Sequence, residues 1–130
     1  WEIFNWQDYK KKLEQNVLLI FYPGDNTPGC TKQLCDLRDD FTKFQKKDTI
    51  IFGINQTNNI SHKKFINDYS FPFDLLIDID RKVATKYKAL KFMFGRPSIL
   101  RSVILINKEG KIIFLKRGMP KDKDILESLK

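Results

Sequence analysis

The chain has 130 residues, of which 42% are hydrophobic and 31% charged, and this composition predicts one ordinary globular domain over residues 1–130. No apolar run approaches the roughly 20 residues that cross a membrane, so we expect no membrane partner. The net charge is +8, but the basic residues form no long block, so we expect a solvated lysine-rich surface and no nucleic-acid partner. Two cysteines and one histidine exclude a disulfide framework and a four-cysteine zinc site.

The first part of the chain predicts two helical segments with a strand between them. Three residues at helical spacing indicate a short amphipathic turn or helix: Trp6, Tyr9 and Leu13. The continuously apolar run Val17–Tyr22 ends at Pro23 and predicts a buried central strand. Apolar residues then recur at spacings of four and three, which predicts a helix over Cys30–Lys43; they are Cys30, Leu34, Leu37, Phe41 and Phe44.

The rest of the chain alternates between strand and helix patterns. Strands are predicted over residues 49–54, 75–77, 103–106 and 112–115, and helices over 61–69, 80–87 and 120–129. Asp78 or Asp80 is the expected cap of the second of these helices, and Asn107–Gly110 is the turn of a β-hairpin. The order β-α-β-α-β-α-β-β-α favours an α/β fold, with a central mixed sheet flanked by helices on both faces.

The segment Pro23–Cys35 carries the strongest chemical signal. Cys30 is expected at the start of a helix that follows a strand, where the helix dipole and free amide N–H groups favour an anion. A thiol in such a place tends to ionise, and the thiolate is the reactive form. Cys35 lies five residues further on. The sequence therefore predicts a pair of redox-active thiols at a loop-to-helix junction.

This segment resembles the peroxiredoxin family, and most closely its bacterioferritin-comigratory-protein (Q-type) class. The pattern Pro-x-x-x-Thr-x-x-Cys is met by Pro23, Thr27 and Cys30, and a second cysteine at plus five is typical of that class. The resemblance continues through four further segments and covers nearly the whole chain: residues 54–56, 61–65, 71–78 and 101–112. It implies a thioredoxin-like fold and a monomeric, cytoplasmic antioxidant enzyme. It also implies a thiol peroxidase that needs no metal, haem or nucleotide cofactor.

The resemblance assigns roles to the residues around Cys30. Cys30 is the nucleophile that attacks a peroxide oxygen, with Thr27 and the amides near Gly29 as hydrogen-bond donors. Arg101 supplies positive charge and two hydrogen-bond donors in a fixed fork. Sequence spacing alone could not choose Arg101 over another arginine for this role. The substrate-binding set is Pro23, which stiffens the loop, Gly29, which permits close backbone approach, and Gln33, which either orients the site or caps the helix.

Cys35 is the expected resolving thiol, which forms an intramolecular disulfide with Cys30 that a thioredoxin- or glutaredoxin-like protein then reduces. Five residues of ideal helix separate two Cα atoms by about 8–9 Å, whereas a disulfide needs less than about 7 Å. We therefore expect oxidation to unwind the first turns of the helix. We expect the family's N-terminal β-hairpin to be absent from this chain. The sequence begins at Trp1 rather than at a methionine, so it does not exclude a targeting segment.

Two alternatives and some lesser features remain. A thiol–disulfide oxidoreductase of the same fold would need Cys-x-x-Cys, and a copper-binding or chaperone module would need Cys-x-x-x-Cys with a nearby histidine. The lone His62 is expected to be a surface or capping residue rather than a catalyst. Lys91–Arg96 is expected to be a mobile loop, and its Phe92 and Phe94 to fill the core or line the mouth of the site.

Overall fold

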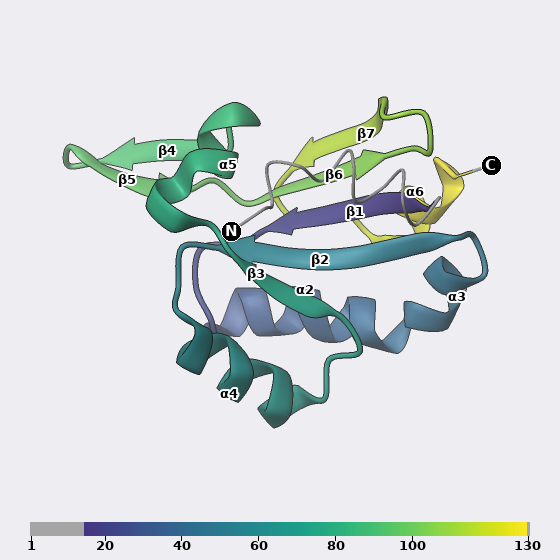
Figure 1. The fold of residues 1–130 in the computed structure, drawn as a ribbon, viewed down its shortest axis with the longest axis horizontal. Helices are drawn as coiled ribbons and strands as arrows, with labels where there is room; N and C mark the ends of the chain where they lie inside the picture. The colour runs from purple at the N-terminus through teal and green to yellow at the C-terminus, as the bar shows by residue number, and fades with distance from the viewer. Residues whose placement is uncertain (1–14, 130) are drawn as a thin grey trace.

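The computed structural model describes residues 15–129. Figure 1 shows a sheet with helices packed against it and a small hairpin that projects from one end. The strands are β1 (Asn16–Phe21), β2 (Thr49–Asn55), β3 (Asp74–Ile77), β4 (Leu90–Met93), β5 (Arg96–Ile99), β6 (Ser102–Ile106) and β7 (Ile112–Arg117). The helices are α2 (Pro28–Asp39), α3 (Phe41–Gln45), α4 (Asn59–Tyr69), the 3₁₀ turn η2 (Ile79–Arg81), α5 (Lys82–Lys86) and α6 (Asp122–Glu127).

The main sheet has five strands in the order β3-β2-β1-β6-β7. β1 pairs in parallel with β2, and β2 with β3, while β6 and β7 are antiparallel to their neighbours. β1 therefore lies at the centre, and five of its six residues are buried. This position explains its unbroken apolar sequence, because a central strand covered on both faces has no side that needs polar residues.

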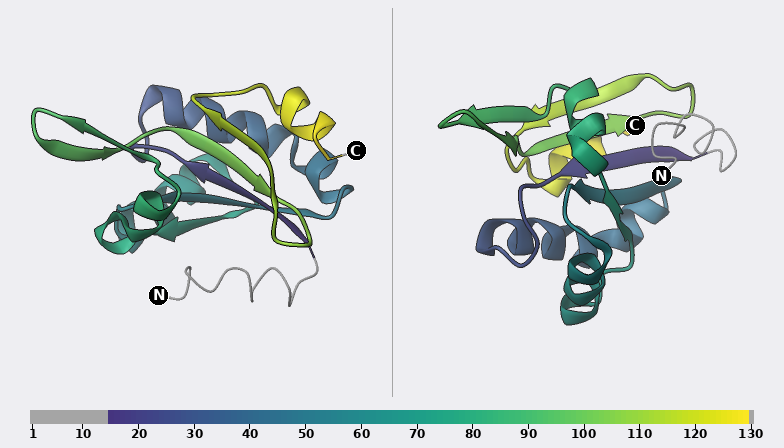
Figure 2. Two further views of the ribbon diagram at one scale, coloured as in Figure 1. Left: turned by 90° about the horizontal axis from the view of Figure 1, so that it is seen from above. Right: turned by 60° about the vertical axis from the view of Figure 1, so that its left-hand side comes forward.

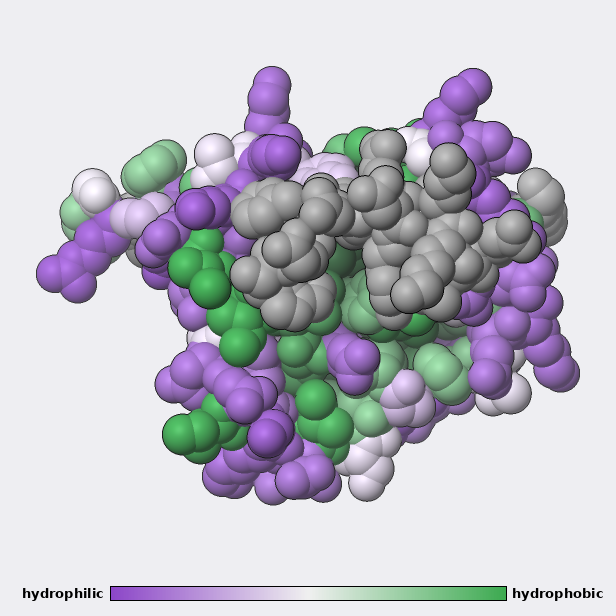
Figure 3. All heavy atoms as spheres, in the orientation of Figure 1, coloured by the Kyte–Doolittle hydropathy of each residue, from purple (hydrophilic) through white to green (hydrophobic). Residues whose placement is uncertain are grey.

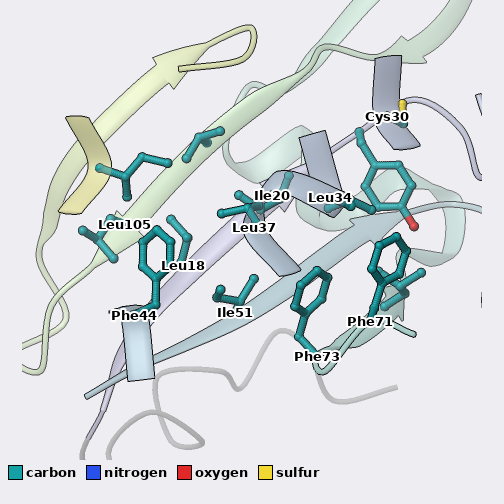
Figure 4. Close-up of a cluster of buried hydrophobic side chains, with 14 of the residues drawn as sticks. Leu18, Ile20, Cys30, Leu34, Leu37, Phe44, Ile51, Phe71, Phe73 and Leu105 are labelled. Atoms are coloured by element: carbon teal, nitrogen blue, oxygen red, sulfur yellow. The ribbon is translucent and has the colours of Figure 1, made fainter. Parts of the chain in front are cut away.

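Alternate residues of β1 enter two separate hydrophobic cores. Leu18 and Ile20 face a core built with α2, α3, α4 and α6, part of which Figure 4 shows with Cys30 at one edge. Val17, Leu19 and Phe21 face a second core, to which α5 contributes Val83 and Ala84. Helices thus cover both faces of a mixed sheet, which confirms the predicted α/β fold class with a central mixed sheet flanked by helices.

The predicted helix over Cys30–Lys43 is wrong in one respect, because the structure divides it. α2 ends at Asp39, and Asp40 leaves the helical region with φ −98° and ψ 8° before α3 begins. The interruption falls at the pair Asp39–Asp40, shortly after Asp36, because aspartate has a low helix propensity and the dipole disfavours carboxylates near the carboxyl end of a helix. Cys30 and Cys35 nevertheless lie on the same helix.

The expectation of a loop over Lys91–Arg96 is also wrong. β4 and β5 pair as an antiparallel hairpin, with Leu90 opposite Ile99 and Met93 opposite Arg96. Phe94 and Gly95 both have positive φ, 53° and 76°, which is the geometry of a two-residue hairpin turn. Figure 2 shows that this hairpin extends away from the body of the molecule.

Smaller differences concern the helix ends. The helix expected over 80–87 is a 3₁₀ turn followed by the short α5, and the last helix covers 122–127 rather than 120–129. Asp78 caps α5, because its carboxylate accepts hydrogen bonds from the amides of Val83 and Ala84 at 2.8 and 2.9 Å. The predicted helix at residues 6–13 lies outside the described residues. Within residues 15–129, none of the helices is long and apolar enough to cross a membrane.

A cavity of about 430 Å³ lies between α2 and the segment that leads into α6, and Asp40 and Asp122 both line it. Burial raises the pKa of Asp122 to about 7, with the hydrogen bond and negative charge of Asp40 adding to the effect. The folded state therefore binds a proton that the unfolded chain releases near pH 4. This contribution to stability is complete below that pH and is lost as the pH rises through 7.

We expect Asp122→Asn to stabilise the protein at pH 8 by roughly 1 kcal/mol and to change little at pH 4, a value reduced because the carboxyl is partly exposed. Urea unfolding of the parent and the variant at both pH values measures this difference. Asp124→Asn, an exposed position on the same helix, is the matched control. An equal change at the two pH values would show that charge repulsion at Asp122 is not the cause.

Candidate active site

Cys30 lies at the junction between the end of β1 and the start of α2. Thr27 is the N-cap residue, Pro28 occupies the first helical position, and Cys30 follows within the first turn. Pro28 has no amide N–H, so its place at a helix start leaves no hydrogen bond unmade. Cys30 is fully buried, and its place in the first turn puts it at the positive end of the helix dipole.

The guanidinium of Arg101 lies directly against this thiol. Arg101 precedes β6, and its Nη2 donates a hydrogen bond to Cys30 Sγ at 3.2 Å. Its Nη1 donates to Gln33 Oε1 at 2.8 Å, and Gln33 is 7% exposed. Because β6 pairs with β1, the sheet brings residues 71 positions apart into contact. The planar guanidinium of Arg101 is thus fixed by hydrogen bonds to Gln33 and Cys30, and its positive charge lies next to the Cys30 sulfur.

Gly29 makes room for this arrangement. A Cβ atom on Gly29 would lie 3.3 Å from Arg101 Nη2, closer than side chains normally tolerate, so a glycine here lets the guanidinium reach the helix. Two of the other arginines lie elsewhere. Arg38 donates to the Tyr69 carbonyl, and Arg96 lies on the exposed β4–β5 hairpin.

Thr27 and Pro23 lie in the same loop but outside this contact. The Thr27 hydroxyl donates to the Gly24 carbonyl at 3.1 Å, and its side chain makes no capping bond to α2. Pro23 is half-buried directly after Tyr22, which follows β1. The structure therefore brings Cys30, Gly29, Gln33 and Arg101 together, and the expected contact of Thr27 with a bound peroxide stays a prediction.

Cys35 lies on α2, one and a half turns beyond Cys30. Both thiols are free, and Cys35 is half-buried and packs against the main core. With both residues on an intact helix, their Cα atoms are about 8–9 Å apart by helix geometry, which is too far for a disulfide. The dithiol form shown by the structure must therefore change locally before the two sulfurs meet.

A second polar cluster lies under the loop that leads to Cys30, and the sequence did not reveal it. Asp25 accepts hydrogen bonds at 2.6–3.2 Å from four side chains: Tyr22, Asn55, Ser61 and His62. The side chains of Asp25 and His62 are each 3% exposed. The second ring nitrogen of His62 bonds the Leu76 carbonyl at 3.1 Å. The interpretation of His62 as a surface or capping residue is therefore wrong.

This cluster keeps Asp25 ionised. Burial acts to raise the pKa of Asp25, but hydrogen bonds from His62, Ser61 and Tyr22 outweigh it and lower the pKa below its ordinary value. Burial, with the nearby charge of Asp25, raises the pKa of Tyr22, so the Tyr22 hydroxyl stays protonated and donates a hydrogen bond to Asp25. The carboxylate thus ties the active-site loop to β2, to α4 and, through His62, to β3. The only signal in the sequence was the position of Asp25 inside the Pro23–Cys30 motif.

Metal chemistry has no candidate centre in this part of the chain: among residues 15–129, no three His, Cys, Asp or Glu side chains are grouped as metal ligands. The site consists of one thiol held against a guanidinium, a second thiol on the same helix, and a buried carboxylate that anchors the loop between β1 and α2.

Comparison with known proteins places this geometry in a family. The model of the AhpC/TSA family matches residues 1–115. Peroxiredoxin Bcp of Bacillus subtilis is 41% identical over 110 residues, which cover 82% of this chain and 68% of the relative. Peroxiredoxin Q of Sedum lineare chloroplasts is 38% identical over 117 residues, which cover 88% of this chain and 61% of the relative.

A solved structure has a similar fold. The bacterioferritin comigratory protein of Xanthomonas campestris, described for its alkyl peroxide reduction activity, superposes with a TM-score of 0.81 at 27% identity, covering 89% of this chain and 78% of that one. With the family model matching most of the chain and relatives near 40% identity, the chain belongs to the AhpC/TSA family and is a peroxiredoxin of the bacterioferritin-comigratory-protein (Q-type) class.

Proposed function

We propose that Cys30 is the peroxidatic residue through which this peroxiredoxin, a thiol-dependent peroxidase, reduces hydrogen peroxide and organic hydroperoxides. The observation that carries the proposal is the Arg101 guanidinium 3.2 Å from Cys30 Sγ and fixed by Gln33. A thiolate is the nucleophile in this reaction, and an adjacent cation favours it over the thiol. A fixed donor beside the sulfur is also well placed to stabilise charge on the reacting oxygens.

In the first step the Cys30 thiolate attacks one oxygen of the peroxide. The O–O bond breaks, and the other oxygen leaves as hydroxide or alkoxide and takes up a proton to become water or an alcohol. Cys30 is left as a sulfenic acid. In the geometry proposed, Arg101 donates to the oxygens as charge moves from sulfur to the leaving oxygen, with Thr27 and the first amides of α2 as further donors.

In the second step the Cys35 thiol condenses with the Cys30 sulfenic acid, releasing water and forming the disulfide. Because the helix holds the two residues too far apart, we propose that the first turns of α2 unwind at this stage. A dithiol protein then reduces the disulfide. Its two thiols are oxidised, and the two thiols of the chain return.

Treatment of the reduced protein with one equivalent of hydrogen peroxide tests both steps. We expect loss of two free thiols and about two mass units, mapped to Cys30 and Cys35, together with a decrease in helical circular dichroism. The physical reason for the decrease is that the disulfide and an intact α2 exclude each other.

Two variants complete this experiment. Cys30→Ser should consume no peroxide, and Cys35→Ser should gain about 16 or 32 mass units on Cys30 and keep its helix signal. An unchanged helix signal in a chain that carries the Cys30–Cys35 disulfide would refute the unwinding step. Unchanged thiols in the folded, reduced parent would refute the peroxidase function itself.

The finer parts of the proposal concern partners and context. We propose a thioredoxin- or glutaredoxin-like protein as reductant and a monomeric enzyme. We also propose the cytoplasm as the compartment, because a transient catalytic disulfide is typical of proteins in reducing compartments. The rival thiol–disulfide oxidoreductase is less well supported, because the cysteines lie five positions apart on α2 rather than three. Turnover of peroxide by the parent, and none by Cys30→Ser, separates the two activities.

A further inference from the structure

The net positive charge of the chain is concentrated in one stretch. Residues 81–108 hold eight of the 24 basic residues and none of the 16 acidic ones, so the remainder of the chain has 16 of each sign. Six of the eight basic residues fall in residues 81–96, which form α5 and the β4–β5 hairpin. The charge of this stretch therefore equals the whole excess charge of +8, and two of its basic residues, Lys91 and Arg96, lie on the hairpin strands themselves.

The hairpin also carries two large apolar side chains that project into solvent. Phe92 is 71% exposed and Phe94 is 98% exposed. Phe92 lies opposite Pro97, so these two residues share one side of the hairpin, and Phe94 lies in its turn. Lys91 lies on the other side, opposite Ser98. Figure 3 shows hydrophobic and hydrophilic spheres side by side on this projection, at the left of the molecule.

The hairpin stands beside the redox centre. β5 ends at Ile99, and two residues later Arg101 contacts Cys30 Sγ. Phe94 is seven residues from Arg101, so extended chain limits the separation of their Cα atoms to about 25 Å. An average protein interface covers roughly 800 Å² on each partner, which is about 30 Å across. One docked protein can therefore cover both the hairpin and the site. The views in Figures 1 and 2 agree that the hairpin and the start of α2 lie at the same end of the sheet.

We infer that the hairpin is the docking surface for the protein that reduces the Cys30–Cys35 disulfide, and that this partner presents an acidic face with an apolar pocket around its own dithiol. The inference rests on the proposed function. Phe92 and Phe94 are the anchors, since exposed aromatic residues that become buried supply much of the affinity of an interface. The basic residues steer an acidic partner toward the site. A second copy of this chain would bring the same positive charge, and is disfavoured.

The docked partner reduces the disulfide by thiol–disulfide exchange. A thiolate of the partner attacks one sulfur of the disulfide, which breaks the S–S bond, forms a mixed disulfide and releases the other cysteine as a thiolate. The second thiol of the partner then attacks the mixed disulfide and frees the remaining cysteine. Two electrons pass from the partner to this chain, and the partner leaves as a disulfide. A small dithiol carries out the same chemistry without needing the hairpin.

This difference provides the test. Peroxide turnover is measured with dithiothreitol and, separately, with an acidic bacterial thioredoxin kept reduced by its reductase and NADPH. For the double variant Phe92→Ser/Phe94→Ser we expect the KM for thioredoxin to rise at least tenfold, and the rate with dithiothreitol to stay at the parent value. Lys91→Glu should lower kcat/KM for thioredoxin at low salt, and added salt should shrink its difference from the parent.

The control is Lys111→Glu, an exposed change of the same charge at the β6–β7 turn, which Figure 1 shows at the opposite end of the sheet. It should leave both rates at the parent values. An unchanged KM for thioredoxin in the double phenylalanine variant would overturn the inference. Anionic vesicles that bind the parent but not this variant, with thioredoxin kinetics unchanged, would overturn it in favour of a lipid surface. Failure of the parent to turn over peroxide with dithiothreitol would instead refute the proposed function.

Discussion

Arg101→Met should slow the reaction of Cys30 with hydrogen peroxide by about 10²–10³-fold, since removing one fixed donor from a developing charge costs that much in other enzymes. The variant loses both the positive charge beside the sulfur and the hydrogen bonds that join Cys30 to Gln33. Arg101→Lys should recover only part of the rate, because an ammonium cannot bond both partners with the same fork. A single turnover in a rapid-mixing instrument, without any reductant, measures this step alone.

The matched control is Arg96→Met, which removes an exposed arginine from the hairpin and leaves the guanidinium at Cys30 in place. Its single-turnover rate should equal that of the parent. If Arg101→Met also reacts at the parent rate while it remains folded, the guanidinium does not stabilise the transition state, and helix amides and Thr27 become the remaining donors.

Asp25→Ala should destabilise the protein by about 3–5 kcal/mol, because each buried donor left without an acceptor costs about 1–3 kcal/mol. The reason is that four side-chain donors lose their acceptor in a place that water does not reach. Urea unfolding at neutral pH gives the difference. Asp68→Ala is the control, because Asp68 forms an exposed pair with Lys64 on the surface of α4 and should barely alter stability.

The pH dependence of the parent carries the same information. The folded pKa of Asp25 lies below the ordinary value of 3.8, so its ionisation contributes stability above about pH 4, and that contribution disappears as the pH falls through the folded pKa. Asp25→Ala should lack this part of the acid sensitivity. A variant as stable as the parent at neutral pH would show that the network under the active-site loop contributes little.

The sequence predicted those elements whose pattern depends on burial alone. The middle parts of β1 and β2 are apolar because the sheet places them between two cores, and the β6–β7 hairpin follows from Asn107–Gly110, where Gly110 has φ 85°. The β4–β5 hairpin was not predicted because its strands have only four residues each. Only Leu90 and Ile99, at one end, contact a core, so the sequence shows no alternation of polarity.

In the site, too, local features could be predicted from the sequence and long-range contacts could not. The Pro23–Cys30 motif is local, so its position at a helix start could be read from neighbouring residues. The contact of Arg101 with Cys30 joins positions 71 apart and came from family resemblance, since spacing could not separate Arg101 from the other arginines. The hydrogen bond between Asp25 and His62, which are 37 positions apart, depends on α4 packing beneath the loop between β1 and α2. The residues next to either side chain give no sign of this contact.

The start of α2 has a consequence for the lifetime of the oxidised enzyme. The side chain of Thr27 makes no capping bond, the first turn has no acidic residue, and Gly29 in that turn has a low helix propensity. A helix that opens easily lets Cys35 reach the sulfenic acid before a second peroxide converts it to a sulfinic acid, which ordinary thiols do not reverse. If α2 opens as proposed, a variant with a more stable helix start should therefore form more sulfinic acid on Cys30 at high peroxide than the parent does.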